Sequence, residues 1–157
     1  MSVTTKSAVV RVENTFELSV QGPFERVVPL FGAGEERAWA GDEWTPAFLY
    51  PQPARDEQGE VFTVMHDLGE ATWVNTVLDL ASGRFQYVYV LPRVLATVID
   101  IEATRAGAAR THVAVTYRRT ALDPRQNAHV AALGEHDRAS GPEWQAQLDA
   151  AIAPSRH

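Results

Sequence analysis

Five strand-like runs follow one another between residues 60 and 122, with no helical pattern between them. They cover residues 60–66, 72–80, 85–91, 95–103 and 110–122, and they are rich in β-branched and aromatic side chains. Their separators contain the turn-forming pairs Gly69-Glu70, Ser82-Gly83, Pro92-Arg93 and Ala106-Gly107. Such short connections predict an antiparallel meander and argue against βαβ units, which need a crossover helix.

A further strand and a short helix are predicted before this meander. Residues 8–20 end in an alternation that places Phe16, Leu18 and Val20 on one face. Gly22-Pro23 ends the strand, and a short helix can begin at Pro23. The next segment, residues 35–53, carries four aromatic side chains among glycines and prolines, so we expect a brief strand over residues 37–40 and then an ordered loop.

The chain is predicted to end in helix after Asp123-Pro124, which suits a helix start. Gly134 weakens this helix, and Ser140 stands three residues before Glu143, a capping-box pattern that can start a second segment. A kinked helix and two consecutive helices are both compatible with this pattern. Trp144, Leu148 and Ile152 recur every four residues, so we expect this apolar face to be buried against the sheet.

The order of elements favours an α+β helix-grip fold, in which a curved antiparallel β-sheet wraps around a long C-terminal helix and a short helix follows the first strand. At 157 residues the chain is expected to form one domain over residues 1–157, with residues 1–7 and 154–157 as flexible ends.

Composition excludes several classes of function. Lys and Arg number 14 against 20 Asp and Glu, and a net charge of −6 disfavours nucleic-acid or acidic-membrane surfaces. The chain has no cysteine, which removes disulfides and thiolate chemistry and fits a reducing compartment. We find no apolar stretch typical of a signal peptide or a spanning helix, so we expect a cytoplasmic protein without membrane insertion.

Three segments are typical of one known superfamily: the opening at residues 16–31 (FELSVQGPFERVVPLF), the aromatic stretch at 44–51 (WTPAFLYP) and the late strand at 113–122 (VAVTYRRTAL). Through these segments the chain resembles the SRPBCC superfamily, the START-like and Bet v 1-like proteins that include polyketide cyclases, Hsp90-ATPase-activator homologues and many bacterial proteins. These segments are features of the scaffold, so the resemblance carries over no catalytic residue.

The resemblance implies a cavity between the sheet and the C-terminal helix that takes hydrophobic or aromatic ligands. Strand alternation and the supply of aromatic side chains suggest which residues line it, with few charges among them. The expected ligand-binding residues are Trp39, Phe62, Trp73, Tyr87, Tyr117 and Trp144.

The histidines are weak candidates for catalysis and for metal binding. His66, followed by Asp67 at the end of a strand, is a weak candidate for a catalytic base, although adjacent strand residues face opposite ways. His129 and His136 are seven residues apart, whereas helical metal ligands are typically four apart. Even with His112 added, no ligand spacing emerges, so we expect no metal and no cofactor.

Polar residues on the strands have structural interpretations. Asn75 shares a face with Trp73 and faces either solvent or a pocket, with solvent slightly favoured. Asp100 and Glu102 alternate with apolar residues and are expected to face outward. Arg118 and Arg119 point to opposite faces, so at most one can enter the cavity, and a surface role is favoured.

Three functional hypotheses follow. The leading one is binding of a small hydrophobic or aromatic molecule without a cofactor. The second is a polyketide cyclase or dehydratase-type enzyme that uses the same cavity. The third is an Hsp90-activator-like module that meets a protein partner through the aromatic stretch at residues 44–50. An exposed part of the meander could also support a homodimer.

Overall fold

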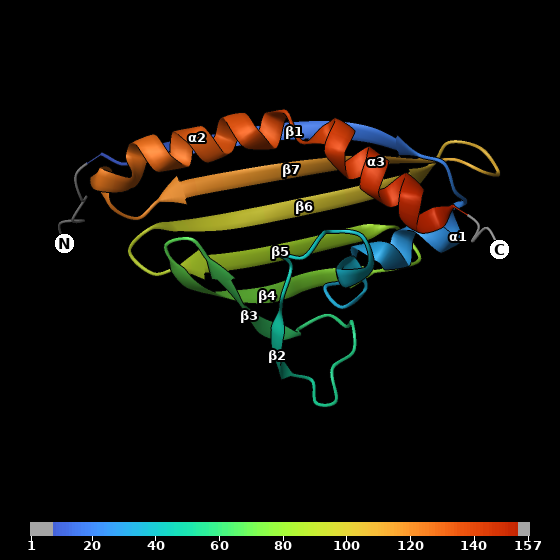
Figure 1. The fold of residues 1–157 in the computed structure, drawn as a ribbon, viewed down its shortest axis with the longest axis horizontal. Coiled ribbons are helices and arrows are strands. Elements are labelled where there is room, and N and C mark those ends of the chain that lie inside the picture. The colour runs from blue at the N-terminus through green and yellow to red at the C-terminus, as the bar shows by residue number, and fades with distance from the viewer. Residues whose placement is uncertain (1–7, 154–157) are drawn as a thin grey trace, which may run out of the picture.

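Within residues 8–153, which the computed structural model describes, seven antiparallel strands form one sheet in the order β1-β7-β6-β5-β4-β3-β2. Strand β1 lies beside the last strand, and the other six follow one another as a meander (Figure 1). The five strands β3 to β7 are those that the sequence predicts. The strands are β1 (Arg11–Val20), β2 (Ala47–Tyr50), β3 (Val61–His66), β4 (Gly69–Asp79), β5 (Arg84–Leu91), β6 (Leu95–Arg105) and β7 (Thr111–Ala121). The termini expected to be flexible, residues 1–7 and 154–157, lie outside the described residues.

Alternation along the long strands separates a buried face from a polar outer face. On β6, Ile99 and Ile101 are buried, and Ile101 pairs with Val115 of β7 on the same face. On the outer face, Asp100 accepts a hydrogen bond from Arg118, which also contacts Glu13 with its Nε 2.9 Å from the carboxylate Oε1. The predicted outward position of Asp100 is therefore confirmed, and Glu102 beyond it is exposed.

The C-terminal segment forms two consecutive helices, α2 (Asn127–Arg138) and α3 (Gly141–Ile152), preceded by the 3-10 turn η3 (Pro124–Gln126). They lie along β1 and β7 on one side of the sheet (Figure 1). Ser140 marks the break, but its hydroxyl donates to the carbonyl of His136 (2.7 Å) instead of capping α3. The second helix does begin where the capping-box pattern indicates, but the side-chain cap itself is not formed. The His136 carbonyl that accepts from the Ser140 hydroxyl also accepts from the backbone N–H of Ala139 at 3.1 Å. Leu148 and Ile152 are buried as predicted, while Trp144 is only partly buried.

Two glycines let these helices approach β1 closely. A Cβ on Gly134 would lie 2.9 Å from Cγ2 of Val12, and one on Gly141 would lie 3.2 Å from the carbonyl oxygen of Glu17. Close packing of α2 on β1 thus explains why a glycine stands at position 134, although glycine lowers helix propensity. The α2 helix sits close enough to the sheet for its side chains to meet those of β7.

The region between β1 and β3 differs from the prediction. The short helix is present as α1 (Phe24–Val27) and the 3-10 turn η1 (Val28–Phe31), but residues 37–40 form no strand, because Glu35–Ala38 is the 3-10 turn η2. The indole nitrogens of Trp39 and Trp44 donate to the carbonyls of Leu30 (2.7 Å) and Ala33 (2.8 Å). These tertiary hydrogen bonds fold the segment back on η1, and a short strand, β2, follows where a loop was expected.

Candidate functional site

A cavity of about 580 Å³ lies between the inner face of the sheet, helices α2 and α3, and the loop around η2. Strands β3 to β7 supply its floor, with Val64, Trp73, Tyr89, Ile99 and Tyr117 among the residues that face it. The α2 and α3 residues His129, Leu133, His136, Glu143 and Trp144 supply the opposite wall. Its size is in the range of cavities that hold small organic molecules.

The structure brings together five of the six residues expected to bind a ligand. Trp39, Trp73, Tyr87, Tyr117 and Trp144 all line the cavity, and so does the fourth tryptophan, Trp44. Phe62 does not reach it. Its side chain is fully buried and packs against the rings of Trp73 (5.6 Å between centroids) and Tyr87 (6.3 Å).

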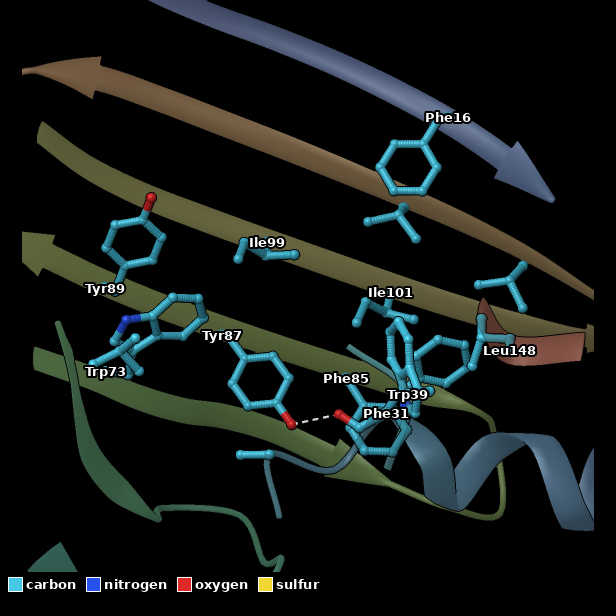
Figure 2. Close-up of a cluster of buried hydrophobic side chains, with 14 of the residues drawn as sticks. Phe16, Phe31, Trp39, Trp73, Phe85, Tyr87, Tyr89, Ile99, Ile101 and Leu148 are labelled. Carbon is cyan, nitrogen blue, oxygen red and sulfur yellow. Dashed lines mark hydrogen bonds between the residues drawn. The ribbon is translucent and has the colours of Figure 1, made fainter. Parts of the chain in front are cut away.

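Tyr87 and its neighbours project from adjacent strands on one face, as Figure 2 shows for Trp73, Tyr87 and Tyr89. The hydroxyl of Tyr87 donates to the carbonyl of Phe31 over 2.6 Å, drawn as a dashed line in Figure 2. This bond ties η1 to the sheet, and the burial of the ring raises the pKa of the Tyr87 phenol. The Tyr87 hydroxyl is therefore a neutral structural group whose hydrogen is already used.

Arg119 enters the cavity, contrary to the surface role favoured by the sequence. It is buried and forms a two-point ion pair with Asp137 of α2, with Nε 2.6 Å from Oδ2 and Nη2 2.8 Å from Oδ1. Its Nη1 donates to the hydroxyl of Tyr89 at 2.6 Å and to that of Thr97 at 3.4 Å. Burial opposes the charge of the guanidinium, but Asp137, Tyr89 and Tyr117 together outweigh this effect and the pKa of Arg119 is raised.

The inward position of Arg119 can be read from β7, where Val113, Val115, Tyr117 and Arg119 alternate on one face. The sequence gives no such signal for Asp137, because its partner is fixed only when α2 packs on the sheet. Arg119 also lies over the ring of Tyr117, 4.7 Å from its centroid. Burial raises the pKa of the Tyr117 phenol, and the neighbouring charge of Arg119 lowers it in part.

His66 lines the cavity but is not arranged as the base considered from the sequence. Its ring stacks against Tyr89 (5.0 Å between centroids) and lies parallel to Trp73. The indole nitrogen of Trp73 donates to His66 Nε2 at 3.3 Å, so a neutral ring carries its hydrogen on Nδ1. Burial and, to a lesser degree, Arg119 lower the pKa of His66, while Asp67 raises it. No hydrogen bond joins His66 to Asp67 among the described residues.

Comparisons with known proteins identify this architecture. No protein-family model and no curated protein matches the chain. Among solved structures, truncated norcoclaurine synthase from Thalictrum flavum matches with a TM-score of 0.67 and 12% identity, over 95% of this chain and 95% of that one. The chain has the same helix-grip fold as these solved structures. The fold class predicted from the sequence is thus confirmed.

Two further structures share this helix-grip fold. The di-domain ARO/CYC BexL from the BE-7585A biosynthetic pathway matches with a TM-score of 0.68 and 16% identity, over 90% of this chain and 48% of that one. This chain therefore spans about half of BexL. Mll3558 protein from Rhizobium loti gives a TM-score of 0.64 and 19% identity, over 93% of this chain and 100% of that one.

A buried polar pair lies outside the cavity lining, and one of its members, Asn75, pairs with Tyr87 across β4 and β5. Asn75 is fully buried, which corrects the slight preference for solvent, and its Nδ2 donates to Oε1 of buried Glu60 at 3.3 Å. The backbones of the two residues are also bonded, from Asn75 N to Glu60 O at 3.0 Å. Burial, followed by the negative charge of Asp56, raises the pKa of Glu60 to about 8. Glu60 is therefore mostly neutral at pH 7.

The lining of the helix-grip cavity carries more charge than the sequence suggested. Besides Arg119, four carboxyl groups contribute to it, from Glu36, Glu43, Asp67 and Glu143. The pKa of Glu36 is raised well above its usual value by burial and by the charges of Asp56 and Glu60. The strand alternation used for the prediction does not include these residues, because they come from loops and helices.

The other histidines within residues 8–153 are His112, His129 and His136. His129 and His136 line the cavity from α2, whereas His112 lies on the outer face with Nε2 3.7 Å from Oε1 of Glu17. Within residues 8–153, no three side chains of the ligand-forming types converge in a geometry that could hold a metal ion. No helix in the same range is long and apolar enough to cross a bilayer.

Proposed function

We propose that this protein binds a small aromatic molecule in the helix-grip cavity. The observation that carries the proposal is the gathering of all four tryptophans, with Tyr87, Tyr89 and Tyr117, around one cavity of about 580 Å³. Aromatic rings supply a large apolar contact area and offer edges and faces for another ring. One solved helix-grip structure, norcoclaurine synthase from Thalictrum flavum, is a complex with dopamine and hydroxybenzaldehyde, which supports an aromatic ligand here.

Binding can be measured by tryptophan fluorescence, because a naphthalene derivative bound among the tryptophans should change the intensity of their fluorescence. We expect acetylnaphthalene, an uncharged aromatic probe, to quench tryptophan fluorescence saturably and to bind with a negative heat-capacity change in calorimetry. Absence of saturable binding by acetylnaphthalene and by its hydrocarbon analogue isopropylnaphthalene would overturn the proposal.

Two variants on the same helix locate the binding. Leu133 lines the cavity, whereas neighbouring Ala132 is exposed and outside it. Leu133→Trp should fill part of the cavity and weaken probe binding at least tenfold in calorimetry. Ala132→Trp should leave the affinity unchanged. Equal effects of both variants would place the bound probe outside the cavity.

A cyclase or dehydratase-type enzyme is the second candidate, favoured by one observation: two titratable rings, His66 and Tyr89, stack together in the cavity. A molecule that co-purifies with the protein would distinguish the two functions. A carrier returns that molecule unchanged in mass after release and rebinding, whereas an enzyme that eliminates water returns a lighter product.

A protein-interaction module built on residues 44–50 is less well supported. Trp44 and Phe48 pack inward, with ring centroids 5.9 and 5.5 Å from that of Phe62. Only Leu49 and Tyr50 are exposed large side chains in this stretch. They do not form the flat aromatic patch that this hypothesis requires.

A further inference from the structure

The hydroxyl of Tyr89 has a hydrogen to give and no group within residues 8–153 to receive it. Arg119 can only donate hydrogen bonds, so the 2.6 Å contact between its Nη1 and the Tyr89 oxygen uses that oxygen as acceptor. No other hydrogen bond of Tyr89 is found in the described part of the chain. Because Tyr89 lines the cavity, its O–H group is available to a bound molecule.

The position of this hydroxyl is fixed from two sides. The ring of Tyr89 stacks on Trp73, with centroids 4.3 Å apart, and on His66, with centroids 5.0 Å apart. The guanidinium that holds its oxygen is itself held by two hydrogen bonds to Asp137. A donor whose position is set by the protein loses little freedom when a ligand arrives, which favours specific recognition.

The cavity around this donor does not favour an anion. The positive charge of Arg119 is matched by Asp137, and the other charged residues on the lining are the four carboxyl-bearing residues named above. An anionic ligand would lose its hydration and meet no unpaired positive charge. Arg119 therefore polarises the Tyr89 hydroxyl, and it does not itself act as an anion-binding group.

From this arrangement we infer that the cavity selects uncharged aromatic molecules with an oxygen acceptor, which takes the Tyr89 hydroxyl hydrogen. This inference rests on the proposed function and adds the chemical class of the ligand. Tyr89 is then the specificity-determining residue, and Asp137 and Arg119 are positioning residues.

Three naphthalene probes of similar shape test the inference by calorimetry on the intact protein. Acetylnaphthalene has a carbonyl acceptor, isopropylnaphthalene has none, and naphthoate is an anion. We expect acetylnaphthalene to bind about two- to twelvefold more tightly than isopropylnaphthalene, the range of one net hydrogen bond, and naphthoate to bind most weakly. Tyr89→Phe should abolish the preference for acetylnaphthalene.

Tyr87→Phe is the matched comparison, because it removes a hydroxyl from the same cavity whose hydrogen is already spent on Phe31. It should change the affinities for the ketone and the hydrocarbon by the same factor. Circular dichroism and thermal unfolding establish that each variant is folded. If Tyr89→Phe does not fold, the wild-type protein still tests the inference, because equal affinities for acetylnaphthalene and isopropylnaphthalene would overturn it.

The outcomes separate the two proposals. If none of the probes binds, the proposed function fails. If the probes bind but the ketone and the hydrocarbon have equal affinities, or folded Tyr89→Phe keeps the preference, the cavity binds aromatic molecules and the role of Tyr89 is overturned. Tighter binding of naphthoate than of the uncharged probes would overturn the exclusion of anions.

Discussion

The carboxyl group of Glu60 and the amide of Asn75 face each other where solvent does not reach either side chain. Asn75 Nδ2 donates to Glu60 Oε1, while Glu60 Oε2 and Asn75 Oδ1 find no hydrogen-bond partner in the described residues. Two orphaned acceptors beside each other are costly when buried. A proton on Glu60 turns one of them into a donor, which agrees with the raised pKa of this group.

This pair predicts that the protein loses stability as the pH rises. The pKa of Glu60 is about 8 in the folded protein against an ordinary value of 4.5, so the folded state binds more protons between these values. The free energy of unfolding therefore falls across this window, by up to about 5 kcal/mol from Glu60 alone. Urea unfolding measured from pH 5 to pH 9 in steps of about one unit checks the slope.

Glu60→Gln should remove most of that slope, because a glutamine amide can donate to Asn75 without titrating. The variant should be more stable than the wild-type protein at about pH 8 and similar to it at about pH 5. Glu102→Gln, at an exposed position on the outer face, is the control and should leave the slope unchanged. A slope that persists in Glu60→Gln would show that another group, such as Glu36, carries it.

The parts of the fold that the sequence predicts are those with a strong local pattern. On β6 and β7, alternation over eleven residues each fixes both the strands and their faces, and it places Arg119 inward beside Tyr117. The predicted surface role of Arg119 followed from the usual preference of arginine for solvent and disagreed with this alternation. The alternation was the better guide, because Asp137 supplies the partner that burial requires.

The parts that could not be predicted depend on contacts between distant segments. Residues 37–40 were expected to form a strand, but the indole of Trp39 bonds to Leu30 and the segment folds as η2. Asn75 sits just before a register irregularity in β4, and its partner Glu60 lies outside the neighbouring strand. The local sequence pattern predicts neither the partner of Asn75 nor the register irregularity.

The Arg119–Asp137 pair leads to a prediction about stability. Asp137→Asn should lower the free energy of unfolding by about 3–5 kcal/mol, because it leaves a buried guanidinium without its counter-charge. Glu135→Gln, which removes the partner of Arg138 in an exposed pair, should cost less than about 1 kcal/mol. Chemical denaturation of both variants measures the difference. Similar costs for the two would mean that the inner pair is hydrated.

The double variant Arg119→Met and Asp137→Leu extends this test. Asp137→Asn leaves the Arg119 guanidinium buried without a counter-charge. Replacing both residues by apolar side chains removes that buried charge, so the double variant should recover much of the stability lost in Asp137→Asn. It should also abolish the polarisation of Tyr89, although the cavity remains aromatic. A double variant less stable than Asp137→Asn would show that the ion pair itself organises the packing of α2.

His66 should titrate below its ordinary pKa of 6.5 and be neutral at pH 7. Because burial disfavours the imidazolium, the unfolded state takes up a proton first as the pH falls, and stability from His66 is lost below about pH 6.5. Nuclear magnetic resonance titration of the imidazole carbons measures this pKa directly. Asp67→Asn should lower it further, since the charge of Asp67 raises it. A pKa that rises in Asp67→Asn would contradict the assigned sign.

Gly134 decides how closely α2 approaches the sheet, and its replacement by alanine sets two effects against each other. Alanine raises helix propensity by about 1 kcal/mol, but its Cβ would lie 2.9 Å from Cγ2 and 3.2 Å from Cβ of Val12. Overpacking of this kind typically costs about 1–3 kcal/mol, so we expect Gly134→Ala to destabilise the protein.

Ala132→Gly, at an exposed position on the same helix, is the control. It should cost about 1 kcal/mol through propensity alone and leave acetylnaphthalene binding intact. Gly134→Ala should also weaken that binding, because a displaced α2 carries Asp137 away from Arg119 and moves Leu133 on the cavity wall. Urea unfolding and calorimetry test both effects, and a stabilised variant with unchanged affinity would mean that α2 can shift without disturbing the cavity.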